Sequence, residues 1–377
     1  MKAIISAYAR SPFHLAKKGA LAGIRPDTLA AQVVRGLLNK VDLDPALFED
    51  VILGCAYPEA SQGDNLARVV GLLAGLPVTV GGMTINRFCG SSMSAVHIAA
   101  AQIEAGIGDA YLCVGVESMS MVPQGGFNFS PNPELLVHSD AYISMGQTAE
   151  NVAQRCAVSR AEQEALAVQS HQKAAAAREQ GRLRDEIIPI QLESGDAVTA
   201  DGCIRPATSL EALAALRPAF RPDGVVTAGT SSPLTDGASV VLVTSDEFAA
   251  RHHLPMLARI RAVATVGCDP AVMGLGPIPA TRKVLVRAGL SVDQLDVVEI
   301  NEAFSSQALV CIRELGLSPA TINLDGGGLA IGHPLGATGA RITGKAAAML
   351  KRVGARYALA TQCIGGGQGI ATILERV

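Results

Sequence analysis

The chain has 377 residues, of which 49% are hydrophobic and 17% are charged, with 39 glycines and no tryptophan. This composition is typical of a compact α/β protein rich in alanine and glycine, and it excludes a disordered chain. The formal net charge is −3 and no basic stripe is interleaved with aromatic residues, so the sequence gives no basis for nucleic-acid binding.

Eight cysteines are scattered along the chain without a C-x-x-C pair. We therefore expect neither a zinc site nor a disulfide framework, and a reducing cytoplasm is the expected compartment. The chain opens at once on a strand-like pattern, so no signal peptide is expected, and no apolar run has the length of a membrane span. The last three residues, 375–377, are not a peroxisomal signal.

The hydrophobic pattern of the first third predicts strands that alternate with helices. The expected strands are 2–8, 50–55, 78–85 and 110–115, and the expected helices are 28–38, 65–74 and 92–106. Such alternation predicts a largely parallel sheet with helices on both faces, which is an α/β fold.

Cys89 lies at the junction between the strand that ends at Ile85 and the helix that begins near Ser92. The free N–H groups of a helix start lower the pKa of a thiol and favour the nucleophilic thiolate. The small residues Gly90 and Ser91 leave room for a ligand beside the sulfur. A buried structural cysteine fits the same position equally well, so the position alone does not decide.

Residues 117–235 break the alternating pattern with prolines and glycines, a charged helical stretch over 148–180, and further turns around 195–206. We interpret this segment as an insertion laid over the sheet. Loops on a rigid scaffold commonly supply substrate contacts, so the insertion is the expected place for them.

An internal repeat relates the two ends of the chain at an offset of 246 residues. The matching landmarks are Asp50 with Asp296, Gly82 with Gly328, Gly90 with Gly336, Gly108 with Gly354 and Tyr111 with Tyr357. The repeat predicts two similar βαβ halves, the first interrupted by the insertion. It places Leu335 opposite Cys89 and His333 two residues earlier, which puts the expected site between the halves.

Asn301 follows a predicted strand, and its amide can donate a hydrogen bond or fix a water that does so. A turn or helix-capping role is the alternative, and spacing alone favours that role. His333 is held between Gly332 and Pro334 in a glycine-rich loop that matches neither a P-loop nor a dinucleotide fingerprint. The limited freedom of His333 favours a general base over a structural histidine.

Cys363 ends an apolar strand and is followed by a turn that contains three glycines, at 365–367. The free N–H groups of such a turn can form an oxyanion hole. Together, Asn-x-x-Cys-Gly-Ser at 86–91, Asn-Glu-Ala-Phe at 301–304, Gly-His-Pro at 332–334 and Cys-x-Gly-Gly-Gly at 363–367 resemble the thiolase family, and the match runs along the whole chain.

The resemblance implies a duplicated five-layered α/β/α/β/α fold with an inserted loop domain, and coenzyme A thioesters as substrates. The implied domains are an N-terminal half over 1–117 with 236–248, a loop domain that binds coenzyme A over 118–235, and a C-terminal half over 249–377. It also implies a homodimer or homotetramer, and for degradative members association with a hydratase/dehydrogenase subunit. Neither a metal nor an organic cofactor is implied.

The resemblance also implies a role for each reactive group. Cys89 resembles the acylated nucleophile, His333 the base that takes its proton, and Cys363 the acid/base at the α-carbon of the second acyl-CoA. Asn301, through a water, and His333 would form one oxyanion hole, and the backbone N–H groups of Cys89 and Gly365 would form the other.

Contacts to coenzyme A and substrate are implied within and beside the insertion. Arg205 resembles an arginine near the nucleotide and Ser232 a serine that contacts pantetheine, although a surface ion pair and a turn are the respective alternatives. Ala212 stands where many relatives have a serine, so that contact is expected to be lost. The implied substrate-binding residues are Arg205, Ser232, Ala228, Met145 and Phe304.

The type of thiolase is indicated by two departures from the biosynthetic pattern. Ser144-Met145-Gly146 replaces His-Met-Gly, and Gly229-Thr230-Ser231-Ser232 replaces Gly-Asn-Ala-Ser. Both resemble degradative 3-ketoacyl-CoA thiolases, which cleave 3-ketoacyl-CoA with coenzyme A in fatty-acid β-oxidation. The alternative is a biosynthetic acetyl-CoA acetyltransferase, which condenses two acetyl-CoA molecules.

Two remoter alternatives are a ketoacyl synthase-like enzyme and a lipid carrier without activity. A ketoacyl synthase typically uses two histidines, or a histidine and an asparagine, so Cys363 argues against it. The presence of all four reactive motifs argues against the carrier.

Overall fold

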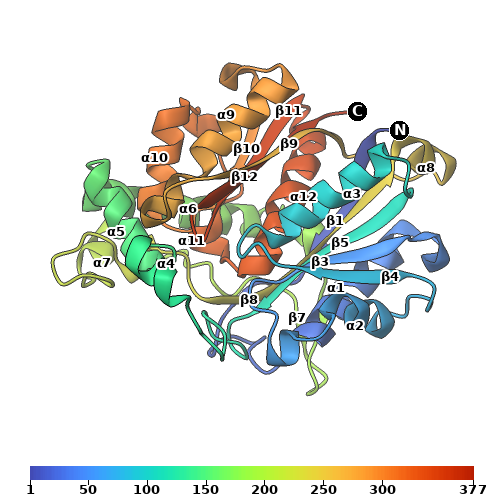
Figure 1. The fold of residues 1–377 in the computed structure, drawn as a ribbon, viewed down its shortest axis with the longest axis horizontal. Coiled ribbons are helices and arrows are strands. Elements are labelled where there is room, and N and C mark those ends of the chain that lie inside the picture. Colours follow the sequence, from blue (N-terminus) through green and yellow to red (C-terminus); the bar gives the residue numbers. More distant parts are fainter.

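The computed structural model describes residues 1–377 and is built on one ten-stranded sheet. Its strands are β1 Ala3–Arg10, β2 His14–Leu15, β3 Asp50–Gly54, β4 Gly81–Ile85, β5 Ala110–Ser118, β8 Thr235–Ser245, β9 Ala258–Gly267, β10 Val297–Ile300, β11 Tyr357–Ile364 and β12 Gln368–Glu375. Their order is β10-β11-β12-β9-β1-β8-β5-β3-β4, with β2 beside β8 (Figure 1).

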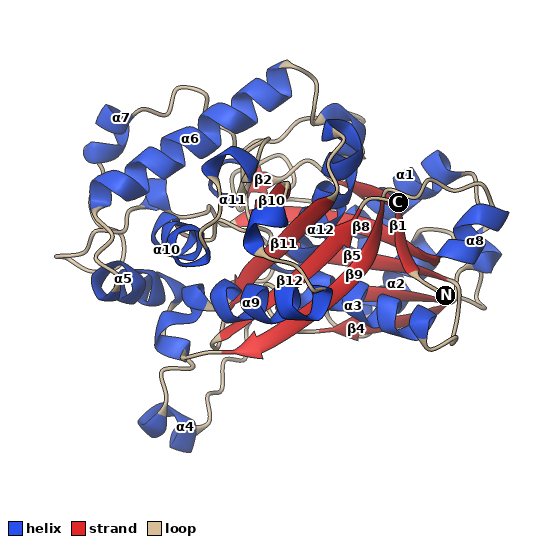
Figure 2. Ribbon diagram, turned by 90° about the horizontal axis from the view of Figure 1, so that it is seen from above, coloured by secondary structure: helices blue, strands red, loops and turns tan.

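Helices cover the outer faces of the sheet, and two more lie between its two halves (Figure 2). They are α1 Pro26–Val41, α2 Leu66–Leu73, α3 Ser91–Glu104, α4 Pro133–His138, α5 Met145–Arg155, α6 Arg160–Glu179, α7 Leu210–Ala214, α8 Asp246–Arg251, α9 Pro277–Ala288, α10 Ser305–Leu315, α11 Gly328–Ile331 and α12 Leu335–Val353. The strands predicted over 2–8, 50–55 and 110–115 and the three predicted helices are all present, with shifted ends.

The two halves of the sheet have the same pattern of strand pairing, as the repeat predicts. β3 pairs with β5 in parallel and β5 with β8 antiparallel, while β10 pairs with β11 in parallel and β11 with β12 antiparallel. The halves join where β1 meets β9, through only two residue pairs, Ile4 with Arg259 and Ile5 with Ala258.

One landmark of the repeat is wrong. The partner of β10 at the place of β4 is Ile322, which bridges Val298 in parallel, whereas Gly328 begins the short helix α11. The C-terminal half therefore has a longer loop before its central helix, and the match between Gly82 and Gly328 is a coincidence. This longer loop carries His333.

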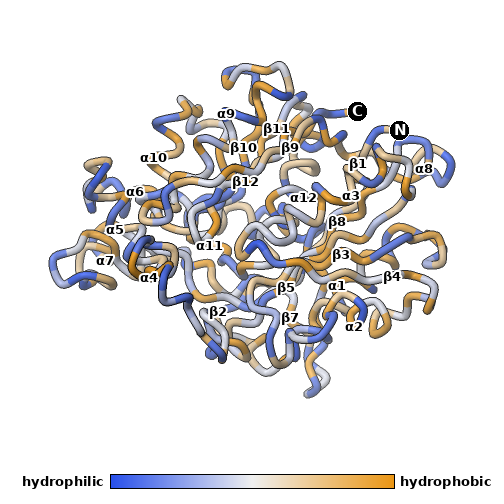
Figure 3. The backbone as a smooth tube through the Cα atoms, in the orientation of Figure 1, coloured by the Kyte–Doolittle hydropathy of each residue, from blue (hydrophilic) through white to orange (hydrophobic).

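Three hydrophobic clusters show how the layers are stacked. One packs α1 and α2 on the outer face of the N-terminal half, a second packs α3 and α12 between the two halves, and a third packs α9 and α10 on the outer face of the C-terminal half. Side chains alternate accordingly, since Leu112 of β5 faces outward and Tyr111 faces the middle layer. The result is the α/β/α/β/α stack that the resemblance implies. Figure 3 shows the hydrophobic colour concentrated along the central strands.

The middle layer is tight because small residues line the contact between its helices. A Cβ at Gly339 of α12 would lie 2.3 Å from the backbone nitrogen of Met93 in α3. Ser92 Oγ accepts a hydrogen bond of 2.8 Å from the Ala340 N–H. The first turn of α3 therefore touches the second turn of α12 in the middle layer.

The segment between β5 and β8 carries α4 to α7 and a small hairpin of β6 Ile190–Gln191 and β7 Ala197–Val198. The single helical stretch expected over 148–180 is two helices, because Ser159 and Glu162 form a capping box that starts α6. The other main difference is that the strand expected over 78–85 begins only at Gly81. None of the helices is both long and apolar enough for a membrane crossing.

Candidate active site

Cys89 lies in a short, internally bonded loop between β4 and α3. Phe88 is in the left-handed region at φ 43°, and its N–H donates to Asn86 Oδ1 at 2.8 Å. Ser91 Oγ donates to the Phe88 carbonyl at 2.6 Å and accepts from the Arg87 N–H at 2.9 Å. These bonds fix the backbone on both sides of the cysteine.

The Cys89 side chain packs against Ala56, Met119 and Leu335. Burial raises the pKa of the Cys89 thiol to about 11, against the opposing effect of the Gly365 N–H and with a further contribution from the Glu117 carboxylate. Burial thus opposes the lowering of the pKa that is expected from the helix start. Leu335 belongs to the apolar cluster against which Cys89 packs, which agrees with the placement expected from the repeat.

Cys363 approaches Cys89 from the opposite half of the molecule. The side-chain amide of Gln362 donates to the Cys89 carbonyl. Gly90 leaves no room for a side chain, since a Cβ there would lie 2.5 Å from Ile364 Cδ1. Burial, and next the nearby Cys89 thiol, raise the pKa of Cys363 well above its ordinary value. Both thiols are thus protonated at rest.

The turn after Cys363 brings a free backbone segment to the Cys89 sulfur. Gly366 and Gly367 have φ of 75° and 85°, a conformation that favours glycine. A Cβ at Gly365 would lie 3.5 Å from Met145 Sδ and 3.8 Å from Phe88 Cδ2. The Gly365 N–H faces the Cys89 thiol, and the two apolar side chains flank this glycine, an arrangement suited to an oxyanion-binding N–H.

His333 is held with one ring nitrogen bonded and the other free. Its Nδ1 lies 2.6 Å from Thr338 Oγ1, and that hydroxyl donates its own proton to the Pro334 carbonyl at 3.2 Å. Thr338 must therefore accept from Nδ1–H, which leaves the lone pair on Nε2. Nε2 is buried and has no partner. Burial and the charge of Arg341 lower the pKa of His333 to about 3, so the ring is neutral.

Asn301 is placed to use its side chain rather than to cap a helix. α10 has Phe304 at its N-cap, and no side chain caps it. Both side-chain amide atoms of Asn301 are buried without a partner. A Cβ at Gly328 would lie 2.7 Å from Asn301 Oδ1, so the glycine loop passes directly over the amide. The capping alternative is not seen.

Sequence reasoning missed Asn323, which organises the backbone beside Asn301. Its Oδ1 accepts from the Ile300 N–H at 3.0 Å, and its Nδ2 donates to the Ile300 carbonyl at 2.9 Å and to Glu302 Oε1 at 2.7 Å. Its φ of 42° is the left-handed conformation that asparagine tolerates. No motif marks this residue in the sequence.

Glu117 is a second residue that sequence reasoning missed. This fully buried carboxylate accepts from the N–H groups of Ala56 at 2.8 Å, Tyr57 at 3.3 Å and Gly336 at 2.9 Å, and from Gln62 Nε2 at 2.9 Å. Burial raises its pKa against these donors. Glu117 thus ties the start of α12 to the loop after β3. An acidic residue in an otherwise apolar strand was the available signal.

The implied coenzyme A contacts lie in two places. The Ser232 N–H donates to the Ala303 carbonyl at 2.9 Å, next to Phe304, whose ring stacks edge-on against Phe220 at 6.0 Å. Ala228 is exposed nearby, at the start of a 3₁₀ turn over Ala228–Thr230.

Arg205 is also exposed. Its backbone N–H donates to His171 Nδ1 at 3.1 Å, and its guanidinium forms no ion pair. The surface ion pair considered as the alternative is therefore not seen.

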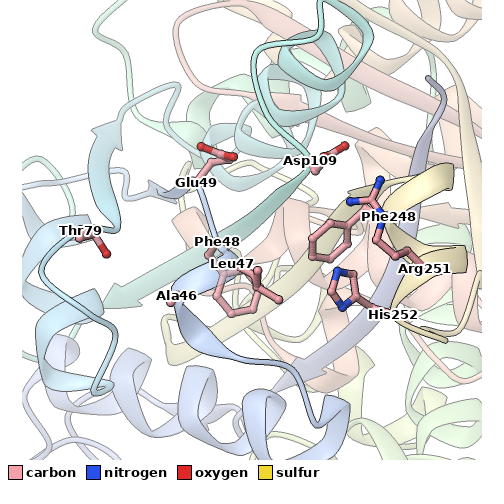
Figure 4. A pocket seen from close by; sticks show the side chains of 9 residues that line it. All are labelled: Ala46, Leu47, Phe48, Glu49, Thr79, Asp109, Phe248, Arg251 and His252. Carbon is pink, nitrogen blue, oxygen red and sulfur yellow. The ribbon is translucent and has the colours of Figure 1, made fainter.

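Two surface hollows lie outside this site. One, of about 360 Å³, is lined by Ala46, Leu47, Phe48, Glu49, Thr79, Asp109, Phe248, Arg251 and His252 (Figure 4). The other, of about 350 Å³, is lined in part by Cys156, Cys268 and Arg282. Neither contains a residue of the candidate site. No three His, Cys, Asp or Glu side chains lie together as a metal-binding set.

Comparison with known proteins gives matches over the full chain. Residues 3–247 match the family model described as "Thiolase, N-terminal domain", and residues 254–376 match "Thiolase, C-terminal domain". A protein named 3-ketoacyl-CoA thiolase from Shewanella sp. (strain MR-7) is 48% identical over all of both chains. Proteins with the same name from Shewanella sp. (strain ANA-3) and Shewanella denitrificans are 47% identical, also over all of both chains.

Proposed function

The chain belongs to the thiolase family, and from this premise we propose that it is a degradative 3-ketoacyl-CoA thiolase with Cys89 as its acyl carrier. The enzyme is an acyltransferase. It cleaves 3-ketoacyl-CoA with coenzyme A and yields acetyl-CoA and an acyl-CoA shortened by two carbons. Full-length relatives that carry this name favour the degradative reaction over acetyl-CoA condensation.

One observation carries the proposal. Cys89 and Cys363, which come from opposite halves, lie close to each other, and the site also contains two polar side chains without partners. Cys89 and Cys363 are linked through the bond from Gln362 to the Cys89 carbonyl. His333 Nε2 and the amide of Asn301 are buried without partners. Buried polar groups are normally satisfied, so these atoms are suited to bind a carbonyl oxygen or water of the reaction.

In the proposed mechanism, His333 Nε2 takes the proton of Cys89, whose sulfur attacks the 3-keto carbon of the substrate. The bond between the α- and β-carbons breaks, and its electron pair forms the enolate of acetyl-CoA, which receives a proton from Cys363. The shortened acyl group remains on Cys89. Coenzyme A then gives its thiol proton to Cys363 and attacks the acyl group. The released Cys89 thiolate recovers its proton from His333, which completes the cycle.

The resting protonation states fit these steps. A thiol with a pKa of about 11 is mostly protonated at neutral pH, so a base is needed to generate the nucleophile. A neutral histidine with a free Nε2 can supply it. The thioester enolate is the developing anion, and the N–H groups of Cys89 and Gly365, with Asn301 and His333, would stabilise the oxyanions. The proposed chemistry calls for no metal or organic cofactor, since thioester α-protons are unusually acidic.

The segment 118–235 is proposed as the loop domain that binds coenzyme A, between halves formed by 1–117 with 236–248 and by 249–377. Arg205 would contact the nucleotide and Ser232 the pantetheine, with Ala228 beside it. Met145 and Phe304 would contact the acyl part, which is supported by the position of Met145 against Gly365.

We also propose a homodimer or homotetramer in the cytoplasm, able to associate with a hydratase/dehydrogenase subunit. The eight free cysteines support a reducing compartment. Native mass spectrometry of the purified protein would give the number of subunits.

The test is to quench the protein during turnover with acetoacetyl-CoA or acetyl-CoA and locate the acyl group by mass spectrometry. We expect it on the peptide that contains Cys89, and none after Cys89→Ser. Acyl label on Cys363 would reverse the two assignments. Thiolysis rates over a series of 3-ketoacyl-CoA chain lengths then separate the two thiolase types, because activity confined to acetoacetyl-CoA would favour the biosynthetic enzyme.

A further inference from the structure

α12 carries a polar stripe on a face that is buried in the middle layer. Thr338, Arg341 and Lys345 follow each other at three- and four-residue spacing, and none is more than 3% exposed. Buried polar side chains of this kind need partners. Thr338 bonds His333, and Lys345 is paired with Asp325 at 2.7 Å. Arg341, between them, is the exception.

Arg341 and Glu299 face each other without making a hydrogen bond. The Nη1–Oε2 distance is 3.8 Å, and each side chain is 1% exposed. Both carboxylate oxygens of Glu299, and Nε and Nη2 of Arg341, have no partner. In a direct, charge-assisted hydrogen bond, the guanidinium nitrogen and the carboxylate oxygen would be about 2.8 Å apart. Unpartnered polar atoms on both of these buried side chains favour an ordered water between them.

This gap lies behind two groups of the proposed reaction. Glu299 is two residues before Asn301 and so points to the same side of the chain at the end of β10. Arg341 lies one helical turn after Thr338, which holds His333. The pair therefore joins the strand that carries Asn301 to the helix that orients His333.

We propose that Arg341 and Glu299 are positioning residues that form a water-bridged pair behind the site, which joins the strand of Asn301 to the helix of Thr338 and places a cation behind the His333 ring. Neither residue touches the reacting atoms. The proposal rests on the proposed role of His333 as the base that deprotonates Cys89.

The charges around the two groups support this assignment. Burial and then Arg341 lower the pKa of His333 to about 3. The other titratable groups next to its loop are Glu117, which bonds the Gly336 N–H, and the thiols of Cys203 and Cys89, which contact Gly332 and Leu335. Arg341 is the cation among them.

Glu299 faces charges from several elements. Burial raises its pKa to about 7, while Arg341 and Lys345 oppose this and the carboxylates of Asp325 and Glu186 reinforce it. The carboxylate is therefore poised between its charged and neutral forms near neutral pH, and it can offset only part of the arginine charge. Burial is the main reason that His333 is neutral, and Arg341 adds to it.

The test compares three variants of the full-length protein by the rate at which Cys89 is acylated between about pH 2.5 and 8, a range that includes the acid limb set by the His333 pKa of about 3, in pulses short enough that the fold persists. In Arg341→Met the imidazole loses its cationic neighbour, so the acid limb of the profile should move up by about one pH unit or more. Arg341→Lys keeps the charge and should retain the wild-type limb. Glu299, with a pKa of about 7, is already neutral along the acid limb, so Glu299→Gln should leave the limb at its wild-type position.

An upward shift confined to the variant without the cation supports the proposal. If Arg341→Met does not fold, the double variant Arg341→Met/Glu299→Gln, which buries no lone charge, is measured instead and should show the same shift. Equal losses at every pH in all variants would overturn the electrostatic role. A crystal structure with a direct bidentate pair and no bridging water would overturn the bridge. Absence of acyl-Cys89 in the wild type would instead count against the proposed function.

Discussion

At the scale of single residues, the chemistry depends on keeping groups neutral until substrate arrives. Cys89 and Cys363 are both held as thiols by burial, and His333 is held as a neutral imidazole. One proton transfer, from Cys89 to His333 Nε2, creates the nucleophile. The motifs in the sequence identify these residues, but they contain no information on burial, which decides the direction of each pKa shift.

Replacing His333 with alanine should slow acylation of Cys89 by about 10² to 10⁴-fold, because the thiol then loses its general base. The measurement is the burst of acyl-enzyme in rapid quench. Restored rates at high pH would fit a thiol that ionises by itself above its pKa of about 11. Near-normal rates across the whole pH range would remove His333 from the mechanism.

Thr338→Val should slow the reaction by removing the hydrogen bond that fixes the tautomer of His333. Valine keeps the shape of threonine but cannot accept from Nδ1–H, so the proton is no longer held away from Nε2. We expect a fall of about tenfold in the acylation rate with little change in the KM for acyl-CoA. Thr343→Val, on the same helix with its hydroxyl bonded to the Gly339 carbonyl, is the matched control. Similar losses in both variants would point to helix stability instead.

The two cysteines should separate by half-reaction. Cys363→Ala should still accept an acyl group on Cys89, but it should fail to exchange the α-proton of acetyl-CoA with solvent. Cys89→Ala should lose acyl transfer and retain at most some exchange. Deuterium uptake into acetyl-CoA, measured for both variants, is more informative than kcat because residues that act as a unit are non-additive. Exchange at the wild-type rate in Cys363→Ala would assign the acid/base elsewhere.

At the scale of the elements, the sequence shows which segments are strands and helices, but it does not show what fixes the loops between them. The periodicity of 92–106 predicts α3, and the repeat predicts α12. The Ser159 capping box that divides 148–180 has the Ser-x-x-Glu signature, and it was visible in the sequence. The roles of Glu117 and Asn323 were not, because each bonds backbone that is distant in sequence.

Glu117→Gln tests the tie between the loop after β3 and the start of α12. The glutamine nitrogen would face N–H donors where the carboxylate now accepts, so we expect a loss of about 2 kcal/mol in unfolding free energy and slower Cys89 acylation. Denaturant unfolding, with Glu134→Gln on the exposed helix α4 as the control, measures the first effect. Unchanged stability and rate would show that Glu117 does not organise the site.

At the scale of the whole molecule, buried ion pairs hold the inserted segment against both halves. Arg10 of β1 bonds Asp201 at 2.6 and 2.8 Å and Glu186 at 2.8 Å, and Glu186 also pairs with Lys345 of α12 at 2.8 Å. The repeat and the motifs predict the two halves and the site between them. They do not predict these contacts, since a charged residue in an isolated sequence is expected at the surface.

Asp325 makes the stability of the folded protein depend on pH. Burial would raise its pKa, but Arg352 and Lys345 lower it to about 2. The folded pKa is depressed, so the stabilisation is complete above the unfolded value of about 4 and is lost as the pH falls toward 2, an effect of about 2 kcal/mol. Acid unfolding of Asp325→Asn should lose this part of the pH dependence, while the exposed Asp223→Asn keeps it. Parallel acid profiles for all three proteins would contradict the assignment.

The contact between the start of α3 and the second turn of α12 has a consequence for the barrier of the reaction. Two helices from opposite halves direct their positive ends toward one small region, and the bond from Ala340 to Ser92 holds them there. The field is present before substrate binds, so charge can form on a thiolate or enolate without the dipoles having to turn. Water would have to reorganise around each new anion, and the reorganisation energy avoided here is a large part of what an enclosed site contributes. Duplication of one helix-bearing half is what supplies two such dipoles to one reaction.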